Sequence, residues 1–267
     1  MPDQHREFYT ALPWIVCAGA DRQDRVWVSL LDGPEGFIQS PSPTALRFGA
    51  EPSDDDPLHS LFDTGGLLGL LGIKLHTRRR NRVNGRISHT GAGRLHFQVS
   101  QSFGNCPQSI HQRGWSRVEA DAPAAPVQRT AELTPQHQHI ISQADTLFIG
   151  SGFLRGENAD ANGYDASHRN GRPGFVHIDS STRLRVPDYP GNQFFNTIGN
   201  LQKDPRVGLL FVDFATGDLL HLSGTATIDW QASKMGDALA QRSIDVDVNN
   251  VIARPGATRL RWKALDV

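Results

Sequence analysis

The amino-acid sequence predicts a mainly β fold in which one barrel-like or sandwich-like domain occurs twice in tandem. Three observations lead to this prediction. A long phrase is repeated at a constant spacing, apolar and polar residues alternate with the period of a strand, and helical patterns are few. A length of 267 residues leaves room for two domains of normal size.

The repeated phrase covers Ser29–Phe48 and Ser167–Val186, which align without a gap at an offset of 138 residues. With one inserted residue the match resumes, because GLLGIKLHT from Gly69 aligns with GLLFVDFAT from Gly208. This period is far too long for a solenoid unit, so we expect two copies of one domain. Eight of the 20 aligned positions in the first phrase are identical to the residue 138 positions later: Ser29, Gly33, Gly36, Phe37, Ser42, Thr44, Leu46 and Arg47.

The second copy carries the clearest strand patterns. In LLHLSGTATI, Leu220, Leu222 and Ala226 share one face and His221 and Ser223 share the other, which predicts a half-buried antiparallel strand. The continuous apolar run RVGLLFVDF predicts a strand that is buried on both sides. The segment ATGD between these two strands predicts a hairpin turn.

Two short helices and a linker complete the expected organisation. One helix is expected between Phe194 and Asp204, where apolar residues recur with helical spacing, and another is expected after Thr134, which precedes a proline. The alanine- and proline-rich segment 120–127 has the composition of a linker. The predicted bounds are 1–119 for the first domain, 120–133 for the linker and 134–267 for the second domain.

Composition and charge exclude several classes of protein. A formal net charge of -1 gives no overall field toward nucleic acid or membranes, and no apolar run is long enough to span a bilayer. The polar start MPDQHREFYT lacks the apolar region of a signal peptide, so we expect a cytoplasmic protein. Cys17 in an apolar run and Cys106 in a loop do not make a disulfide scaffold, and the histidines form no metal-binding pattern, so no metal is expected.

Three segments of the second copy, SHRNGRPGF, RVPDYPGNQFFNTIGNL and DPRVGLLFVDFATGD, resemble the pyridoxamine 5′-phosphate oxidase-like family of split-barrel flavin-binding proteins. GLLGIKLHTRRRNRVNG and QSFGNCPQSI in the first copy resemble the N-terminal half of the two-barrel members of that group. The resemblance implies two tandem split β-barrels that form an internal pseudo-dimer, with FMN bound between barrels. It implies a monomeric pseudo-dimer or a homodimer whose partner is a small-molecule substrate or electron donor.

The two copies differ in charge where the resemblance implies that FMN binds. The second copy has Arg169 and Arg172 in SHRNGRPGF, whereas the first copy has Asp32 and Glu35 in SLLDGPEGF. Downstream, VPDYPGN leads into the expected helix, and the N–H groups at a helix start favour phosphate. The first copy has FGAEPSDDDP there, which would repel a phosphate. We therefore predict that the second copy holds the phosphate and that the first copy has lost its own site.

The resemblance also implies individual FMN-binding residues in the second copy. Ser167 and Arg169, with Arg172 as an alternative, are expected to donate to phosphate or ribityl oxygens, and His168 to face the ring or the ribityl chain. A solvated strand edge is the alternative for this triplet, whereas a Ser-His hydrolytic pair is not expected because adjacent strand residues point to opposite faces. The residues expected along the ribityl chain and the ring edge are Asp188, Tyr189, Asn192 and Asn196.

The first copy is expected to contribute to the same site from TRRRNRVNG and QSFGNCPQSI. Arg80 and Arg82 fall on one strand face, and a cation near N1 and O2 of a flavin stabilises the reduced anionic ring. A solvated hairpin is the alternative for this arginine cluster, and its isolation argues against a nucleic-acid surface. Gln101 and Ser102 match a Gln-Ser pair that, by the resemblance, reaches the flavin bound to the partner barrel.

The expected function is that of an FMN-dependent oxidoreductase that acts on a small molecule. The flavin would supply the redox chemistry, so no side chain is required as a general acid or base, and no catalytic residue is assigned. A non-catalytic carrier or sensor of flavin or haem is the alternative. Pyridoxamine 5′-phosphate oxidase activity itself is not expected, because Arg259-Leu260 precedes Trp262 here, whereas in that family the tryptophan comes first.

Overall fold

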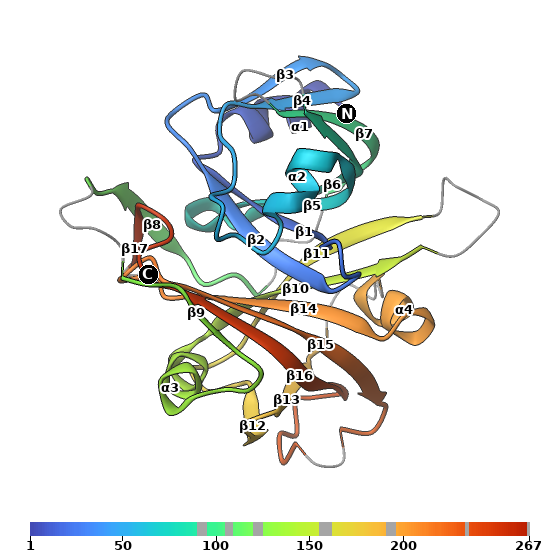
Figure 1. The fold of residues 1–267 in the computed structure, drawn as a ribbon, viewed down its shortest axis with the longest axis vertical. Coiled ribbons are helices and arrows are strands. Elements are labelled where there is room, and N and C mark those ends of the chain that lie inside the picture. Colours follow the sequence, from blue (N-terminus) through green and yellow to red (C-terminus); the bar gives the residue numbers. More distant parts are fainter. Residues whose placement is uncertain are drawn as a thin grey trace.

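Two antiparallel sheets form most of the structure, a computed structural model that describes residues 1–89, 95–104, 109–119, 125–154, 162–190, 196–232 and 235–265. In Figure 1 the blue-to-green first sheet lies above the yellow-to-red second sheet. The first sheet has the order β2-β1-β5-β6-β7-β4-β3. Its strands are β1 (Trp14–Ala20), β2 (Val26–Asp32), β3 (Ile38–Ser42), β4 (Ala45–Phe48), β5 (Gly66–Lys74), β6 (Arg79–His89) and β7 (Leu95–Gly104).

The second sheet repeats this strand order as β11-β10-β14-β15-β16-β13-β12, with β9 (Gln128–Thr130) beside β16. Its other strands are β10 (Thr146–Phe153), β11 (Gly163–Asn170), β12 (His177–Ser180), β13 (Arg183–Asp188), β14 (Arg206–Val212), β15 (Leu219–Asp229) and β16 (Arg242–Arg254). β8 (Arg113–Arg117) pairs with β17 (Leu260–Ala264) in a separate two-stranded sheet. The strand β9 lies within the segment predicted as a linker.

Helices are few and short, which confirms the prediction of a mainly β fold. They are α1 (Asp3–Thr10), α2 (His59–Thr64), α3 (Pro135–Gln143), α4 (Asn196–Lys203) and the 3-10 turn η1 (Leu75–Thr77). The predicted helix start at Thr134 is confirmed, because the Thr134 side chain accepts from the His137 N–H and caps α3. In the part of the chain that the structure describes, no helix is long and apolar enough to cross a membrane.

The two sheets share irregularities as well as strand order. The pairing register shifts at Asn84/Gly85 in the first sheet and at Ser223/Gly224 in the second. A Cβ at Gly85 or Gly224 would lie 2.0 Å from a carbonyl oxygen of the neighbouring strand, so only glycine fits at either bulge. We call the β1–β7 sheet with α1 and α2 the first barrel, and the β10–β16 sheet with α3 and α4 the second barrel.

The turn after β11 has the same geometry as the turn after β2. Gly174 has a φ of 80° and Gly36 a φ of 77°, a left-handed backbone that favours glycine. A Cβ at Gly171 would lie 2.5 Å from the side chain of Phe175, which is buried in the core. The glycines and the phenylalanine of the repeated phrase therefore serve the turn and the core of each barrel.

Three apolar clusters hold the molecule together. One fills the first barrel, one fills the second, and the third lies between the barrels. The third cluster explains a difference from the expected pattern of β15. His221 and Ser223 are buried although they were predicted on a solvated face, because this half of β15 packs against β2 of the first barrel. Only the second half of β15 is half-buried.

Candidate functional site

An open cleft of about 1020 Å³ lies between the two barrels. One wall comes from β5, β6 and β7 of the first barrel, and the other comes from β10, β11 and α4 of the second. The lining residues are Leu67, Asn84, Gly85, Arg86, Ser100, Gln101, Phe153, Asn162, Gly163, Tyr164, Asp165, Asn196, Gly199, Asn200 and Lys203. We refer to this space as the open cleft.

Helix α4 lies along the open cleft with one face. Asn196, Gly199, Asn200 and Lys203 fall at helical spacing and all line the cleft, because residues three and four apart share a helix face. The opposite face buries Ile198 and Leu201 in the core of the second barrel. The apolar spacing that predicted this helix therefore also determines which polar residues reach the cleft.

The first-barrel wall is shaped by the bulge in β6. A bulge re-aims the side chains beside it, and here Asn84, Gly85 and Arg86 all line the cleft. Gln101 lies directly opposite Asn84 on β7 and also lines the cleft. The structure thus places Gln101 in the space between the barrels, and its contact with a flavin stays a prediction.

A chain of polar contacts crosses from the first barrel to the second behind this wall. Arg82 donates to both carboxylate oxygens of Asp165, at 3.1 and 2.9 Å. The Ser167 hydroxyl donates to Asp165 at 3.0 Å and accepts from the Thr197 hydroxyl at 3.0 Å. All four residues are buried, so the cleft wall at Asp165 is held by partners on β6, β11 and α4.

Among the described residues that line the open cleft, unpaired charges are positive. Arg86 on β6 and Lys203 at the end of α4 line it and are exposed. The lining carboxylate of Asp165 is paired with Arg82. Burial raises the pKa of the Tyr164 hydroxyl to about 12, so this lining residue stays neutral at physiological pH. An anionic group is favoured over a cation in this space.

His168 and Arg80 meet on the opposite face of β11 from Ser167. Arg80 donates to Nδ1 of His168 at 3.1 Å, which places the histidine proton on Nε2. The His168 ring lies 5.7 Å from the Phe148 ring between the barrels. Burial, followed by the charge of Arg80, holds the pKa of His168 well below its usual value. The alternation of strand faces therefore separates His168 from Ser167 and Arg169, as the strand geometry predicted.

Arg169 and Asp188 form an ion pair with each other in the second barrel. Asp188 also lies 3.3 Å from Arg242, so two arginines share its carboxylate. Neither Arg169 nor Asp188 is one of the described residues that line the open cleft. The fold brings the side chains of these two predicted residues together, and each neutralises the charge of the other.

The other predicted residues occupy varied positions. Asn196 lines the open cleft, Tyr189 donates to Asp237 at 2.8 Å, and Arg172 is exposed on the turn after β11. Ser102 lies 2.9 Å from Nδ1 of His5. Asn192 lies outside the described residues, as does Cys106.

Sequence reasoning missed Asp165, Asn200, Lys203 and Arg86 as lining residues. A signal was available for the two on α4, because Asn196, Asn200 and Lys203 share the face opposite to the apolar stripe in NTIGNLQK. Asp165 precedes Ser167 by two residues and so shares its strand face, but its cross-barrel partner Arg82 is 83 residues away.

Comparison with solved structures gives matches to single-barrel-sized segments of this chain, whereas no protein-family model and no curated protein matches it. A candidate pyridoxamine 5′-phosphate oxidase of Lactobacillus delbrueckii is 11% identical, with a TM-score of 0.36, over 46% of this chain and 94% of its own. An FMN-binding protein of Syntrophomonas wolfei is 6% identical, with a TM-score of 0.29, over 48% of this chain and 83% of its own. A FAD-binding protein of Mesorhizobium loti is 10% identical, with a TM-score of 0.28, over 48% of this chain and 97% of its own. This chain is thus similar to solved structures of pyridoxamine 5′-phosphate oxidase-like and flavin-binding proteins, at low identity and over about half its length.

Proposed function

We propose that this protein binds FMN in the open cleft and acts as an FMN-dependent oxidoreductase on a small molecule. The observation that carries the proposal is the composition of the cleft: two exposed cations, a polar helix face and apolar surface border one space between the barrels. Two of the motifs that resemble the pyridoxamine 5′-phosphate oxidase-like family fall on elements of the cleft wall, since they include the end of β11 and most of α4.

The space suits a ligand of this size and shape. Cofactor sites have volumes of about 300 to 1,000 Å³, and the cleft measures about 1020 Å³. Two glycines, Gly163 and Gly199, face open space, because a Cβ at either would meet no atom within 4 Å. A ligand can therefore approach the backbone of β11 and of α4 closely.

The donor set matches the three parts of FMN. Lys203 and Arg86 supply positive charge for a phosphate dianion. Asn200 and Gln101 supply amide donors and acceptors for ribityl hydroxyls or a ring edge. Leu67 and Phe153, which are partly exposed, supply apolar surface for the flat ring.

Bound flavin would supply the electron transfer, and the protein would supply placement and electrostatics. The Arg82–Asp165 pair fixes the wall of the cleft at β11, and the neutral Tyr164 adds no charge there. The positive potential from Arg86 and Lys203 favours an anionic ligand over a neutral one.

The direct test is titration of the purified protein with FMN, followed by flavin fluorescence. Lys203→Ala and Arg86→Ala are each expected to raise the Kd for FMN by roughly tenfold, as for the loss of one contact to a charged group. Lys263→Ala, which removes an exposed lysine on β17, is the matched control and should leave the Kd unchanged. Equal Kd values for all three variants would contradict phosphate binding in the open cleft.

The visible absorption spectrum, followed during reduction, distinguishes a flavin-dependent enzyme from a flavin carrier. We expect flavin bands after reconstitution with FMN, and we expect bleaching of these bands by NADH or NADPH in the absence of oxygen. Flavin bands that neither nicotinamide bleaches would instead indicate a carrier or a different electron donor. A Soret band in the purified protein would indicate haem.

A further inference from the structure

The open cleft has a counterpart on the other side of the barrel interface, because the two barrels share strand order and bulges. In the counterpart, the first barrel supplies β2 and the second barrel supplies β14, β15 and β16. The repeat offsets place Arg25 at the position of Gly163, Trp27 at that of Asp165 and Arg206 at that of Leu67. Asn250 lies opposite Ser223 as Gln101 lies opposite Asn84, so it takes the position of Gln101.

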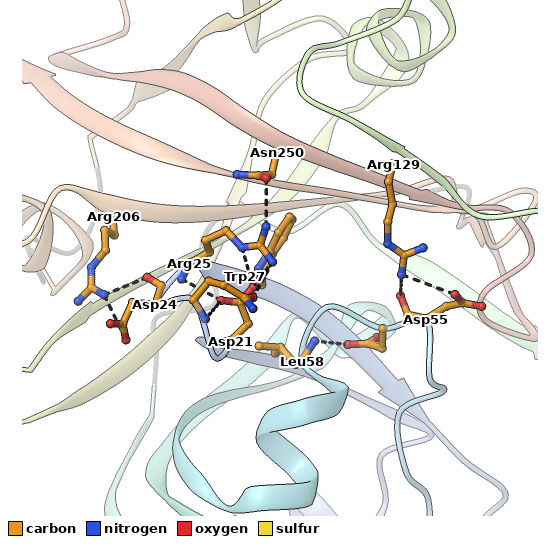
Figure 2. Close-up of polar contacts among 11 residues, drawn as sticks. Asp21, Asp24, Arg25, Trp27, Asp55, Leu58, Arg129, Arg206 and Asn250 are labelled. Atoms are coloured by element: carbon orange, nitrogen blue, oxygen red, sulfur yellow. Dashed lines mark hydrogen bonds and ion pairs between the residues drawn. The ribbon is translucent and has the colours of Figure 1, made fainter.

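Arg25 crosses the counterpart cleft where the open cleft has a glycine. Its Nη1 donates to the Asn250 side-chain oxygen at 3.2 Å, and its Nε donates to Asp21 at 2.7 Å (Figure 2). The corresponding residues of the open cleft are Gly163 and Gln101, which leave the space between them free. One side chain of the protein thus occupies the position that a ligand takes in the open cleft.

Trp27 fills the space beside Arg25. It is fully buried, its indole N–H donates to Asp21 at 2.9 Å, and the Arg25 guanidinium lies 5.6 Å from its ring centre. The corresponding residue of the open cleft is Asp165, whose side chain is drawn aside by Arg82. At the position where the open cleft has a carboxylate, the first barrel thus has a buried aromatic ring that belongs to its apolar core.

Arg206 closes the outer side of the counterpart cleft. It donates to the backbone carbonyl of Asp24 at 2.9 Å (Figure 2). Asp204 accepts from the same arginine, also at 2.9 Å. The corresponding residue of the open cleft is Leu67, which makes no ion pair across the barrels. Arg254 adds a buried contact farther in, where it donates to Asp56 at 2.7 Å.

We propose that each chain binds one flavin, in the open cleft only, because the counterpart cleft is occupied by the Arg25–Asn250 and Arg206–Asp24 contacts and by Trp27. This inference rests on the proposed binding of FMN. The proposal assigns the asymmetry to a particular difference between the repeats, because the first copy has Arg25 where the second copy has Gly163. A flavin in the counterpart cleft would have to separate Arg25 from Asn250 and Arg206 from Asp24, and it would meet the buried indole of Trp27.

The stoichiometry of binding tests this inference on the full chain. Equilibrium dialysis against FMN at concentrations well above the Kd is expected to give one FMN per chain. A ratio of two would overturn the asymmetry while leaving FMN binding intact. A ratio of zero would overturn the proposed function and this inference together, so the two failures are distinguishable.

A variant that fills the open cleft with an arginine gives an independent test. Gly163→Arg places in the open cleft the arginine that occupies the counterpart, opposite Gln101 as Arg25 is opposite Asn250. We expect at least a tenfold rise in the Kd for FMN, with an unchanged circular dichroism spectrum. Ser116→Arg, which adds an arginine at an exposed position of β8 outside the cleft, is the control and should bind FMN as the wild type does. Wild-type affinity in a folded Gly163→Arg protein would overturn the proposal.

Discussion

Arg82 of the first barrel and Asp165 of the second form an ion pair across the barrel interface, with one guanidinium nitrogen within 3.1 Å of both carboxylate oxygens. Only 9% of the arginine side chain and 5% of the aspartate side chain are exposed. Asp165 lines the open cleft and also accepts from Ser167. The relative placement of the barrels and the shape of the candidate site therefore depend on the same contact.

Replacement of Arg82 by leucine is expected to lower the free energy of unfolding by about 3 to 5 kcal/mol. The cause is the buried Asp165 carboxylate, which would keep the Ser167 hydroxyl as its one side-chain donor among the residues that the structure describes. Denaturation by urea measures the change. The double variant Arg82→Leu/Asp165→Leu should recover part of the loss, because no unpaired charge is then buried. Strictly additive losses would show that the two residues do not act as a pair.

Replacement of Arg169 by alanine is expected to affect stability more than FMN binding. Arg169 pairs with Asp188, which is 9% exposed, and its removal leaves that carboxylate with Arg242 as its one ion-pair partner in the described part of the chain. We expect a loss of about 1 to 3 kcal/mol in the free energy of unfolding. The Kd for FMN, measured by fluorescence titration beside Lys203→Ala, should change less than in that variant. A larger rise in Kd for Arg169→Ala would place the phosphate at the turn after β11, where the sequence motif suggested it.

Local patterns predicted strands β14 and β15, the helices α3 and α4, and the repeated phrase whose glycines form the turns after β2 and β11. These features depend on residues close in the chain, such as Thr134 at the start of α3 and Gly174 in the turn after β11. The apolar spacing of Ile198 and Leu201 was enough to predict α4. No long-range information was needed for any of them.

Cross-barrel contacts could not be predicted in the same way. The burial of His221 follows from the packing of β2 of the first barrel against β15, and its ring bonds to the Val28 carbonyl, 193 residues away. The pairing of Arg82 with Asp165 likewise joins two barrels. A strand pattern shows which residues share a face, but it does not show whether that face meets water or another barrel.

The stability of the protein is expected to fall as the pH is lowered from about 6.5 to about 4. His221 is fully buried and its Nδ1–H donates to the Val28 carbonyl at 2.8 Å. Burial lowers the pKa of His221 from 6.5 to about 4. Between these values the unfolded chain binds a proton that the folded protein does not, so the contribution is complete above pH 6.5 and is lost toward pH 4. The loss from this residue is on the order of 3 kcal/mol.

Urea denaturation at several pH values between 4 and 7 measures this slope, and His221→Gln is the variant that isolates it. Glutamine retains a donor for the Val28 carbonyl but does not titrate in this range. The variant should therefore show a shallower decline than the wild type. Part of the decline should remain, because burial and the Arg80 charge lower the pKa of His168 in the same direction. Identical slopes in the two proteins would mean that His221 is already protonated in the folded state, in conflict with its closed surroundings.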